Sequence, residues 1–342
     1  MMKTLDFNSF KTVLLVKPRA IGDVLLATPV IHNLRQQYPH LSIDFLCEKF
    51  AGQVVSGNPF VREVITFDKR NDSTLSVINR VRRRKYDVVI DLFCNPRTAF
   101  ITRWSGAKYR VGFPFRGRSY AYNIHVPPRG GEVHNVDFNL DVLRHFNIAI
   151  TDSRPVFPLG GSDLQMAGEW FKEQGISTDN IVGVNPGGGW YTKKWDTGSY
   201  ARLSDRIILE DRQKVLFFWG PGEFDDVQKI RSQMKQRSEI IPKTTLKEMG
   251  AFLKMCSSLI SNDSGPMHIA ASLGVPTLGI YGPTDPHLQG PYGKNNLWVR
   301  NETLDCLECN LTDCPIGNVC MKDLSVDAVY TAFQQLKNIN VK

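Results

Sequence analysis

The sequence lacks the long apolar segment that a membrane-spanning helix needs. No stretch approaches the roughly 18 consecutive apolar residues that can cross a bilayer. The apolar run near the N-terminus, TVLLVKPRAIGDVLLATPVI, is interrupted by Lys17, Arg19 and Asp23, and no small-residue cleavage site follows a compact apolar core. We therefore expect neither a membrane anchor nor a signal peptide, which makes the cytoplasm the default location.

Several motifs that define other classes of protein are also missing. The first predicted strand leads into KPRAIGDV and not into G-x-G-x-x-G, which argues against the usual dinucleotide fingerprint. No Asp-x-Asp triplet occurs, although metal-dependent sugar transferases often use one to hold a divalent ion on the diphosphate. The chain also has no internal repeat, no low-complexity tract, and no basic motif with interleaved aromatic residues of the kind that binds nucleic acid.

The chain does have a basic excess, and it lies in the first half. Residues 1–150 carry 22 Lys and Arg against 12 Asp and Glu, whereas the remainder carries 20 against 22, and the whole chain has a net charge of +8. This excess favours an anionic partner, such as a phosphorylated substrate, a membrane surface or nucleic acid. The alternative is a solvated basic face without a partner.

The pattern of apolar runs predicts two α/β domains. Short runs rich in β-branched residues alternate with segments of helical periodicity, as in parallel sheets. The segment 151–163 is rich in Pro, Gly and Ser and reads as a linker, so we predict Rossmann-like domains over 1–160 and 161–342 that face each other across a cleft. The expected strands cover 12–17, 42–47, 63–67, 87–93, 110–115, 181–186, 214–220, 257–263 and 276–282, and the expected helices include 22–39, 198–211 and 225–235.

In the second half, the end of the strand over 257–263 predicts a phosphate-binding helix terminus. Ser264 is expected to cap a helix that ends near Ser272, with Gly274 as its stop. The unpaired N–H groups of Ser264, Gly265 and Met267 would then face a ligand, because such donors coincide with the positive end of the helix dipole. The alternative is an ordinary capped helix.

Two further strand ends support a pocket for a nucleoside diphosphate. In NPGGGWYTKKW, three glycines allow the backbone to approach a ligand closely, and Lys193 or Lys194 would neutralise phosphate, although one of them is expected to be merely solvated. In WGPGEFDD, Glu223 and Asp225 are able to accept hydrogen bonds from ribose hydroxyls. The alternative for these acids is a favourable charge at a helix N-terminus.

In the first half, Gly22 and Asp23 stand at the start of the helix that follows the first strand. A carboxylate that faces a phosphate site would serve as general base for a sugar hydroxyl. The alternative for Asp23 is again a simple helix N-terminal acid.

At KPRAIGDVLLATPVIHNLR, NPGGGWYTKKW and NDSGPMHIAASLGVPTLGIYGPTDP, the chain resembles the ADP-heptose–lipopolysaccharide heptosyltransferases of glycosyltransferase family 9, and the resemblance extends over nearly its whole length. It implies a GT-B fold with an acceptor domain over 1–160 and a donor domain over 161–342, the latter carrying a Cys-rich tail and a terminal helix. It also implies inverting transfer of L-glycero-D-manno-heptose from ADP-heptose to the inner core of lipopolysaccharide. No cofactor is expected, and since the Asp-x-Asp triplet is missing, Lys193, Lys194 and helix N-termini would neutralise the diphosphate without a metal ion.

The resemblance also implies roles for individual residues. Asp23 matches the family's proposed base, and Lys193 matches the lysine near the donor phosphates. His268 matches the motif but is equally compatible with a buried structural role. The full set of implied donor-binding residues is Gly22, Gly187, Gly188, Lys194, Glu223, Asp263, Ser264, Gly265, Met267 and His268.

Basic residues of the first half complete the expected site. Arg97, Arg103 and Arg116 would hold an anionic acceptor that carries Kdo carboxylates and phosphates. The run RVRRRKYD over 80–87 would instead touch the anionic inner membrane, or form a solvated helix.

Four of the seven cysteines gather near the C-terminus. Cys306, Cys309, Cys314 and Cys320 have the spacing C-x2-C-x4-C-x5-C, which permits a tetrahedral zinc site, with disulfides or free thiols as the alternatives. Catalysis would not depend on such a site.

Three other functions stay open from the sequence. They are a GT-B transferase for a different nucleotide sugar, a non-catalytic nucleotide- or glycan-binding protein, and an NAD-dependent oxidoreductase. The presence of both Asp23 and Lys193 disfavours the second, and the missing glycine fingerprint disfavours the third.

Overall fold

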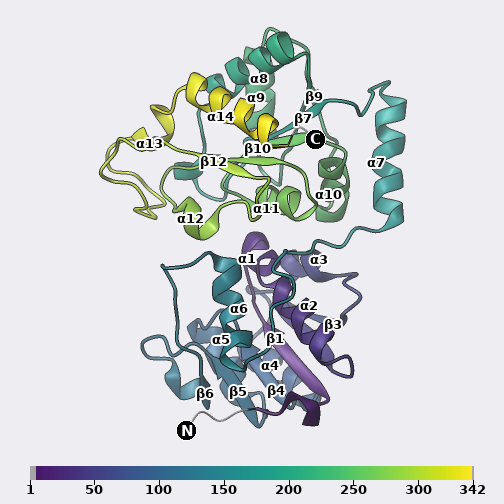
Figure 1. The fold of residues 1–342 in the computed structure, drawn as a ribbon, viewed down its shortest axis with the longest axis vertical. Coiled ribbons are helices and arrows are strands. Elements are labelled where there is room, and N and C mark those ends of the chain that lie inside the picture. The colour runs from purple at the N-terminus through teal and green to yellow at the C-terminus, as the bar shows by residue number, and fades with distance from the viewer. Residues whose placement is uncertain (1–4, 341–342) are drawn as a thin grey trace. The chain divides into compact units, whose positions relative to one another are not determined.

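The computed structural model describes residues 5–340, which form two compact units divided between Pro158 and Leu159. This division lies close to the predicted boundary at residue 160, within a segment, 152–160, that forms no helix or strand. Each unit contains one six-stranded sheet, all of whose strand pairs are parallel, with helices on both faces (Figure 1). The predicted α/β class is therefore confirmed.

The sheet of the first unit has the strand order β3-β2-β1-β4-β5-β6. Strands β2 and β3 are added on one side of β1 and strands β4 to β6 on the other, so the strand order reverses between β1 and β4. The strands are β1 (Thr12–Val16), β2 (Ser42–Glu48), β3 (Val61–Phe67), β4 (Val88–Asp91), β5 (Tyr109–Gly112) and β6 (Ile124–His125). The helices are α1 (Ile21–Leu25), α2 (Thr28–Gln37), α3 (Gly52–Val55), α4 (Thr74–Arg83), α5 (Pro96–Trp104) and α6 (Asn135–His145), with short 3-10 turns η1 (Phe7–Ser9), η2 (Lys49–Ala51) and η3 (Ser119–Ala121).

The sheet of the second unit has the order β12-β11-β10-β7-β8-β9 and reverses between β7 and β10. Its strands are β7 (Ile181–Asn185), β8 (Lys214–Phe217), β9 (Glu239–Ile240), β10 (Ser258–Asn262), β11 (Thr277–Ile280) and β12 (Leu297–Val299). Its helices are α7 (Gly161–Glu173), α8 (Thr197–Asp211), α9 (Phe224–Gln233), α10 (Leu246–Lys254), α11 (Gly265–Ser272), α12 (Pro286–Gln289), α13 (Val319–Lys322) and the terminal α14 (Val326–Ile339), with the 3-10 turn η4 (Tyr191–Lys193).

The central strands are buried on both faces, which explains their uninterrupted apolar sequences. In β1, every side chain from Val13 to Val16 is fully buried. Helices α2 and α6 pack together in the first unit, as do α4 and α5. Apolar runs without alternation are typical of parallel strands covered on both sides. None of the helices formed by residues 5–340 is long and apolar enough to cross a bilayer.

The structure corrects the helix predicted over 22–39, which is divided into α1 and α2. Pro29 lacks the amide N–H that would continue the helix by bonding to the carbonyl of Leu25, and the Thr28 hydroxyl donates to that carbonyl at 2.7 Å instead. The edge strands β6, β9 and β12 were also not predicted, because two or three residues are too few to show a period of two.

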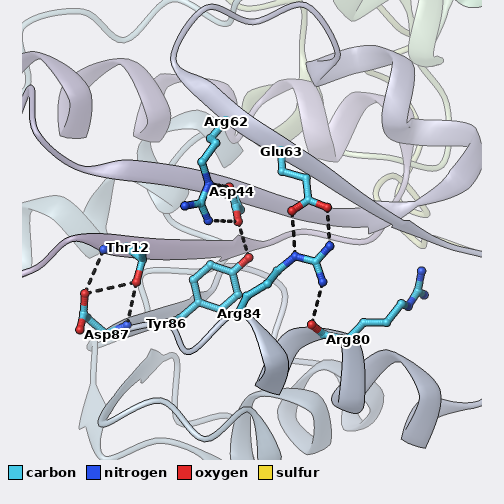
Figure 2. A network of polar contacts seen from close by, with 8 residues as sticks. All are labelled: Thr12, Asp44, Arg62, Glu63, Arg80, Arg84, Tyr86 and Asp87. Atoms are coloured by element: carbon cyan, nitrogen blue, oxygen red, sulfur yellow. Dashed lines mark hydrogen bonds and ion pairs between the residues drawn. The ribbon is translucent and has the colours of Figure 1, made fainter.

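A polar network stabilises the β2–β3 side of the first sheet (Figure 2). The Asp44 carboxylate is fully buried and accepts two hydrogen bonds from the Arg62 guanidinium, at 2.9 and 2.6 Å, and a third from the Tyr86 hydroxyl. Arg84 pairs with Glu63 beside it. A buried carboxylate is tolerated when its oxygens are bonded in this way, so we interpret this cluster as structural.

Candidate functional site

In the second unit, polar side chains converge at the point where the strand order reverses. The Asn262 amide, at the end of β10, donates to the carbonyl of Pro186 at 2.7 Å, just after β7 ends. The Asn185 amide donates to the hydroxyls of Ser261 and Ser264 at 3.0 and 2.9 Å. Ligands of open α/β sheets bind at the carboxyl ends of strands beside such a reversal. These contacts fix two adjacent strand-end loops where a ligand is expected.

Helix α11 (Gly265–Ser272) begins where predicted, but the side chain of its N-cap residue does not cap it. Ser264 occupies the N-cap position, yet its hydroxyl makes no capping bond to the helix and is engaged with Asn185 and Ser261 instead. The first N–H groups of a helix have no acceptor within the helix. In α11, the Ser264 hydroxyl does not accept a hydrogen bond from them either. Gly274, at φ +76°, follows the last residues of the helix as expected for a stop.

Lys193 and Asp263 form an ion pair at the same strand ends. The Lys193 ammonium lies 2.6 Å from Asp263 Oδ2, which also accepts a hydrogen bond from the Thr284 hydroxyl at 2.7 Å. The side chains of Lys193 and Asp263 are only 13% and 5% exposed. The lysine also lies 4.5 Å from the centre of the Trp190 ring. Thr284 was not among the predicted residues, although it lies within the motif NDSGPMHIAASLGVPTLGIYGPTDP.

The neighbouring Lys194 has a different partner. Its ammonium lies 2.7 Å from Asp226 in the first turn of α9. The two consecutive lysines therefore serve separate carboxylates, and only Lys193 contacts the strand-end cluster around Asp263.

Glu223 holds the glycine-rich loop in place. Its carboxylate accepts hydrogen bonds from the N–H groups of Gly188, at 3.0 Å, and Gly220, at 2.8 Å. A Cβ at position 187 would lie 2.3 Å from a carboxylate oxygen of Glu223, a separation that only glycine avoids. The glycines thus allow the loop after β7 to approach Glu223 closely, and the predicted ribose contact of this acid stays a prediction.

Met267 and His268 point their side chains into the protein. Met267 is fully buried, and the Tyr281 hydroxyl lies 3.4 Å from its sulfur. His268 is 7% exposed. The expected contact of a ligand with the Met267 backbone N–H stays a prediction, and the burial of His268 agrees with its structural alternative.

In the first unit, Asp23 lies in the first turn of α1, just after β1. Its carboxylate accepts a hydrogen bond from the N–H of Ala20 at 2.8 Å, and the adjacent Gly22 is buried. Asp23 is half-buried, so its carboxylate keeps access to solvent. The only predicted donor residue of this unit, Gly22, is thus next to the proposed base, whereas the others belong to the second unit.

A buried lysine near Asp23 was not anticipated. The Lys17 ammonium, at the end of β1, donates to the carbonyl of Leu92 at 2.9 Å and to the Asn139 side chain at 3.2 Å. It therefore bridges the reversal point between β1 and β4. Burial lowers the pKa of Lys17, and the carboxylates of Asp23 and Asp91 partly offset this effect. Its position among apolar residues in the sequence gave no signal of this contact.

A basic pocket of about 870 Å³ lies at the ends of β2 and β3 in the first unit. Four cations line it, together with the carboxylates of Glu48 and Asp68 and the rings of Phe50 and Phe67. The cations are Arg19, Lys49, Lys69 and Arg70. None of them was among the predicted acceptor residues, because their clustering depends on how the loops fold.

The three arginines predicted to bind the acceptor have different surroundings in the structure. Arg97, at the start of α5, adjoins the basic pocket: its guanidinium lies 4.7 Å from the Phe67 ring and donates to the carbonyls of Lys69 and Asp72. Arg103 belongs to the last turn of the same helix and lies over Trp104, and Arg116 is exposed in a turn. Of the three, only Arg97 contacts residues of the pocket, and the predicted acceptor contacts of Arg103 and Arg116 stay predictions.

The Cys-rich tail contains thiols in different environments. Cys306 and Cys309 are exposed, Cys314 is half-buried and Cys320 is buried, and all four are free. Across residues 5–340, no three His, Cys, Asp or Glu side chains are arranged as ligands of one metal ion. The zinc site therefore stays a prediction. The cysteines Cys47, Cys94 and Cys256 are buried, as expected.

Comparison with known sequences identifies similar proteins along most of the chain. Residues 74–320 match the family model described as "Glycosyltransferase family 9 (heptosyltransferase)". Lipopolysaccharide heptosyltransferase 3 of Escherichia coli K12 is 27% identical over 299 residues, which cover 82% of this chain and 86% of that protein. Lipopolysaccharide heptosyltransferase 1 of Pseudomonas aeruginosa is 25% identical over 323 residues, covering 88% and 87%.

Solved structures show the same architecture. The crystal structure of the family 9 glycosyl transferase from Veillonella parvula has a TM-score of 0.87 at 25% identity, covering 99% of this chain and all of that one. The E. coli heptosyltransferase WaaC, solved with ADP, has a TM-score of 0.73 at 22% identity, covering 95% and 99%. The prediction of a GT-B fold is confirmed by these likenesses.

Proposed function

Because this chain belongs to glycosyltransferase family 9, a family of heptosyltransferases, we propose that it transfers L-glycero-D-manno-heptose from ADP-heptose to the inner core of lipopolysaccharide. The names of its relatives support lipopolysaccharide as the product class. The observation that carries the proposal is the Lys193–Asp263 pair beside the N-terminus of α11, because it combines a cation with unpaired helix donors at a strand-order reversal.

The second unit would bind the donor. The diphosphate of ADP-heptose would accept hydrogen bonds from the first N–H groups of α11 and pair with Lys193. When the bond between the anomeric carbon and the diphosphate oxygen breaks, negative charge grows on the departing ADP, and the lysine and the helix dipole stabilise it. Because these groups supply the positive charge, the proposed reaction needs no metal ion.

The first unit would bind the acceptor and activate it. Asp23 would remove the proton from the acceptor hydroxyl as the oxygen attacks the anomeric carbon from the face opposite ADP. The new glycosidic bond then has inverted configuration, and the proton remains on Asp23 until solvent takes it. The cations of the basic pocket, with Arg97, would pair with carboxylates and phosphates of the inner core.

The proposal is tested by separating donor binding from turnover. ADP is expected to raise the melting temperature more than UDP or NAD, and Asp23→Asn should keep this stabilisation while losing transfer to inner-core acceptors. Turnover by the unaltered chain should survive EDTA. Preferential stabilisation by UDP would point to a different nucleotide sugar, and full turnover by Asp23→Asn would remove Asp23 from the mechanism.

A further inference from the structure

The positive charge of the protein is concentrated in one short segment. Residues 74–120 contain eleven Lys and Arg against two Asp, so their surplus exceeds the net charge of +8 for the whole chain. Both acids are engaged within the protein: Asp91 is fully buried, and Asp87 accepts hydrogen bonds from the N–H groups of Lys11 and Thr12. The segment therefore presents cations with little compensating negative charge.

Some of these cations face inward and others face solvent. Arg84 pairs with Glu63, and the guanidinium of Arg110 donates to the carbonyls of Ala107 and Ala121. Within the described chain, six exposed members of the segment form no ion pair with a carboxylate, and these are Arg82, Arg83, Lys85, Arg103, Lys108 and Arg116.

Large apolar side chains are exposed among these cations. Helix α5 buries Ala99 and Ile101 but leaves Phe100 and Trp104, one turn apart, 38% and 47% exposed, with their rings 6.2 Å apart. Tyr120 in η3 is 57% exposed. A cluster of aromatic side chains facing water is unusual in a protein surface that has no partner.

The fold brings these residues onto adjacent elements. Helices α4 and α5 pack side by side in the first unit (Figure 1), and the turn η3 contacts α5. The end of α4 meets the end of α5 directly, since a Cβ at Gly106 would lie 3.8 Å from the Arg82 side chain. Leu75, on the same side of α4 as Arg82 because seven residues make about two turns, is 66% exposed.

We propose that this aromatic–basic face, formed by Leu75, Arg82, Arg83, Phe100, Arg103, Trp104 and Tyr120, docks the protein on an anionic lipid bilayer. Trp and Tyr prefer the boundary between headgroups and acyl chains, and cations beside them pair with anionic headgroups. Leu75 favours a bilayer over nucleic acid, because an aliphatic side chain enters the acyl region but offers no ring on which a base stacks. The inference does not depend on the proposed transfer reaction.

The test measures co-sedimentation of the full chain with vesicles, without any substrate. We expect binding to vesicles of phosphatidylglycerol and phosphatidylcholine, weakening with added salt, and no binding to phosphatidylcholine alone. Replacing Arg82, Arg83 and Arg103 with Gln should lower the partition coefficient by about 100-fold. The double variant Phe100→Ser, Trp104→Ser should lower it by on the order of tenfold.

Matched controls keep the result interpretable. The triple variant Lys229→Gln, Arg231→Gln, Arg237→Gln and the double variant Leu209→Ser, Ile339→Ser change exposed residues of the second unit and should bind like the unaltered chain. Brominated lipid should quench part of the tryptophan fluorescence, and Trp104→Phe should abolish that quenching while binding persists.

Three outcomes would overturn the proposal. One is equal vesicle binding by the aromatic–basic variants, with circular dichroism showing that they are folded. Another is quenching that survives Trp104→Phe. The third is capture of single-stranded RNA through the same arginines in the absence of vesicle binding, which would assign the face to nucleic acid.

Discussion

The Lys193 ammonium lies 2.6 Å from Asp263 Oδ2, and the same oxygen accepts a hydrogen bond from Thr284. The lysine is thus held at the strand ends by a carboxylate that is itself oriented by a hydroxyl. A cation fixed in advance stabilises developing charge without having to reorganise during the reaction. Donor binding would then exchange part of this ion pair for contacts to phosphate.

Removing the lysine should affect turnover far more than removing its neighbour. Lys193→Ala is expected to lower kcat by about 10²–10³-fold, because the departing diphosphate loses its cation. It should also lower the free energy of unfolding by about 3 kcal/mol, since the buried Asp263 carboxylate loses its cation and keeps only the hydrogen bond from Thr284. Lys194→Ala, which breaks a partly exposed pair with Asp226, is the matched control. Equal kcat values for the two variants would exclude the assigned role of Lys193.

Thr284 is expected to act through Asp263. Thr284→Val keeps the shape of the side chain but removes the hydroxyl, so the carboxylate loses one buried hydrogen bond, worth about 1 kcal/mol. The KM for the donor should rise several-fold, because Asp263 and Lys193 are less well oriented. Thr284→Ser restores the donor group and should recover most of the affinity. If Ser and Val behave alike, the hydroxyl has no positioning role.

The glycine-rich loop offers a comparison of two adjacent positions. Gly187→Ala places a Cβ 2.3 Å from Glu223, whose carboxylate cannot move away without losing its bonds to the loop backbone, whereas the nearest atoms to a Cβ at Gly188 are 3.5 Å away. We expect Gly187→Ala to lower the free energy of unfolding by about 2 kcal/mol and to weaken ADP binding. Gly188→Ala should change stability little. Similar melting temperatures for the two variants would contradict this packing.

Acid should destabilise the first unit partly through Asp87. Burial raises the pKa of its carboxyl, but hydrogen bonds from the N–H groups of Lys11 and Thr12 and from the Thr12 hydroxyl outweigh burial and lower the pKa. Figure 2 shows the contacts between Thr12 and Asp87. A lowered folded-state pKa means that this stabilisation is present above the unfolded value of about 3.9 and is lost as pH falls through the folded value.

The corresponding experiment is urea unfolding of Asp87→Asn at several acidic pH values. The variant should show a smaller loss of unfolding free energy than the unaltered chain below about pH 4, with a difference of about 0.5 kcal/mol, because the group is partly exposed. Asp313→Asn, at an exposed position, serves as the control. An unchanged slope for Asp87→Asn would contradict the assigned hydrogen bonds.

The main elements of the fold could be predicted because they depend on local pattern. The uninterrupted apolar run of β1 predicted a strand that is buried on both faces. Gly274 predicted the end of α11, because glycine readily adopts the positive φ found there. The site positions followed from the rule that ligands meet parallel sheets at strand ends. These signals reside in consecutive residues and need no knowledge of tertiary contacts.

The contacts within the site could not be predicted in the same way. The hydrogen bond from Thr284 to Asp263 and the one from Lys17 to Leu92 join residues 21 and 75 positions apart. Arg97 and Arg103 look equivalent in sequence, yet they stand at opposite ends of α5. Such relations arise only when the strands and helices are packed, so the basic pocket and the partner of each lysine emerge from the structure alone.

The Asn262 side chain connects the carboxyl ends of the strands in the second sheet to helix α8. Besides bonding to Pro186, the Asn262 side chain accepts a hydrogen bond from the Tyr200 hydroxyl at 2.8 Å, and Tyr200 is a fully buried residue of α8. If the proposed donor binds at these strand ends, selection for altered donor preference should recover substitutions at Tyr200, although its side chain is fully buried. Substitutions that change donor preference would then not be limited to residues that contact the ligand.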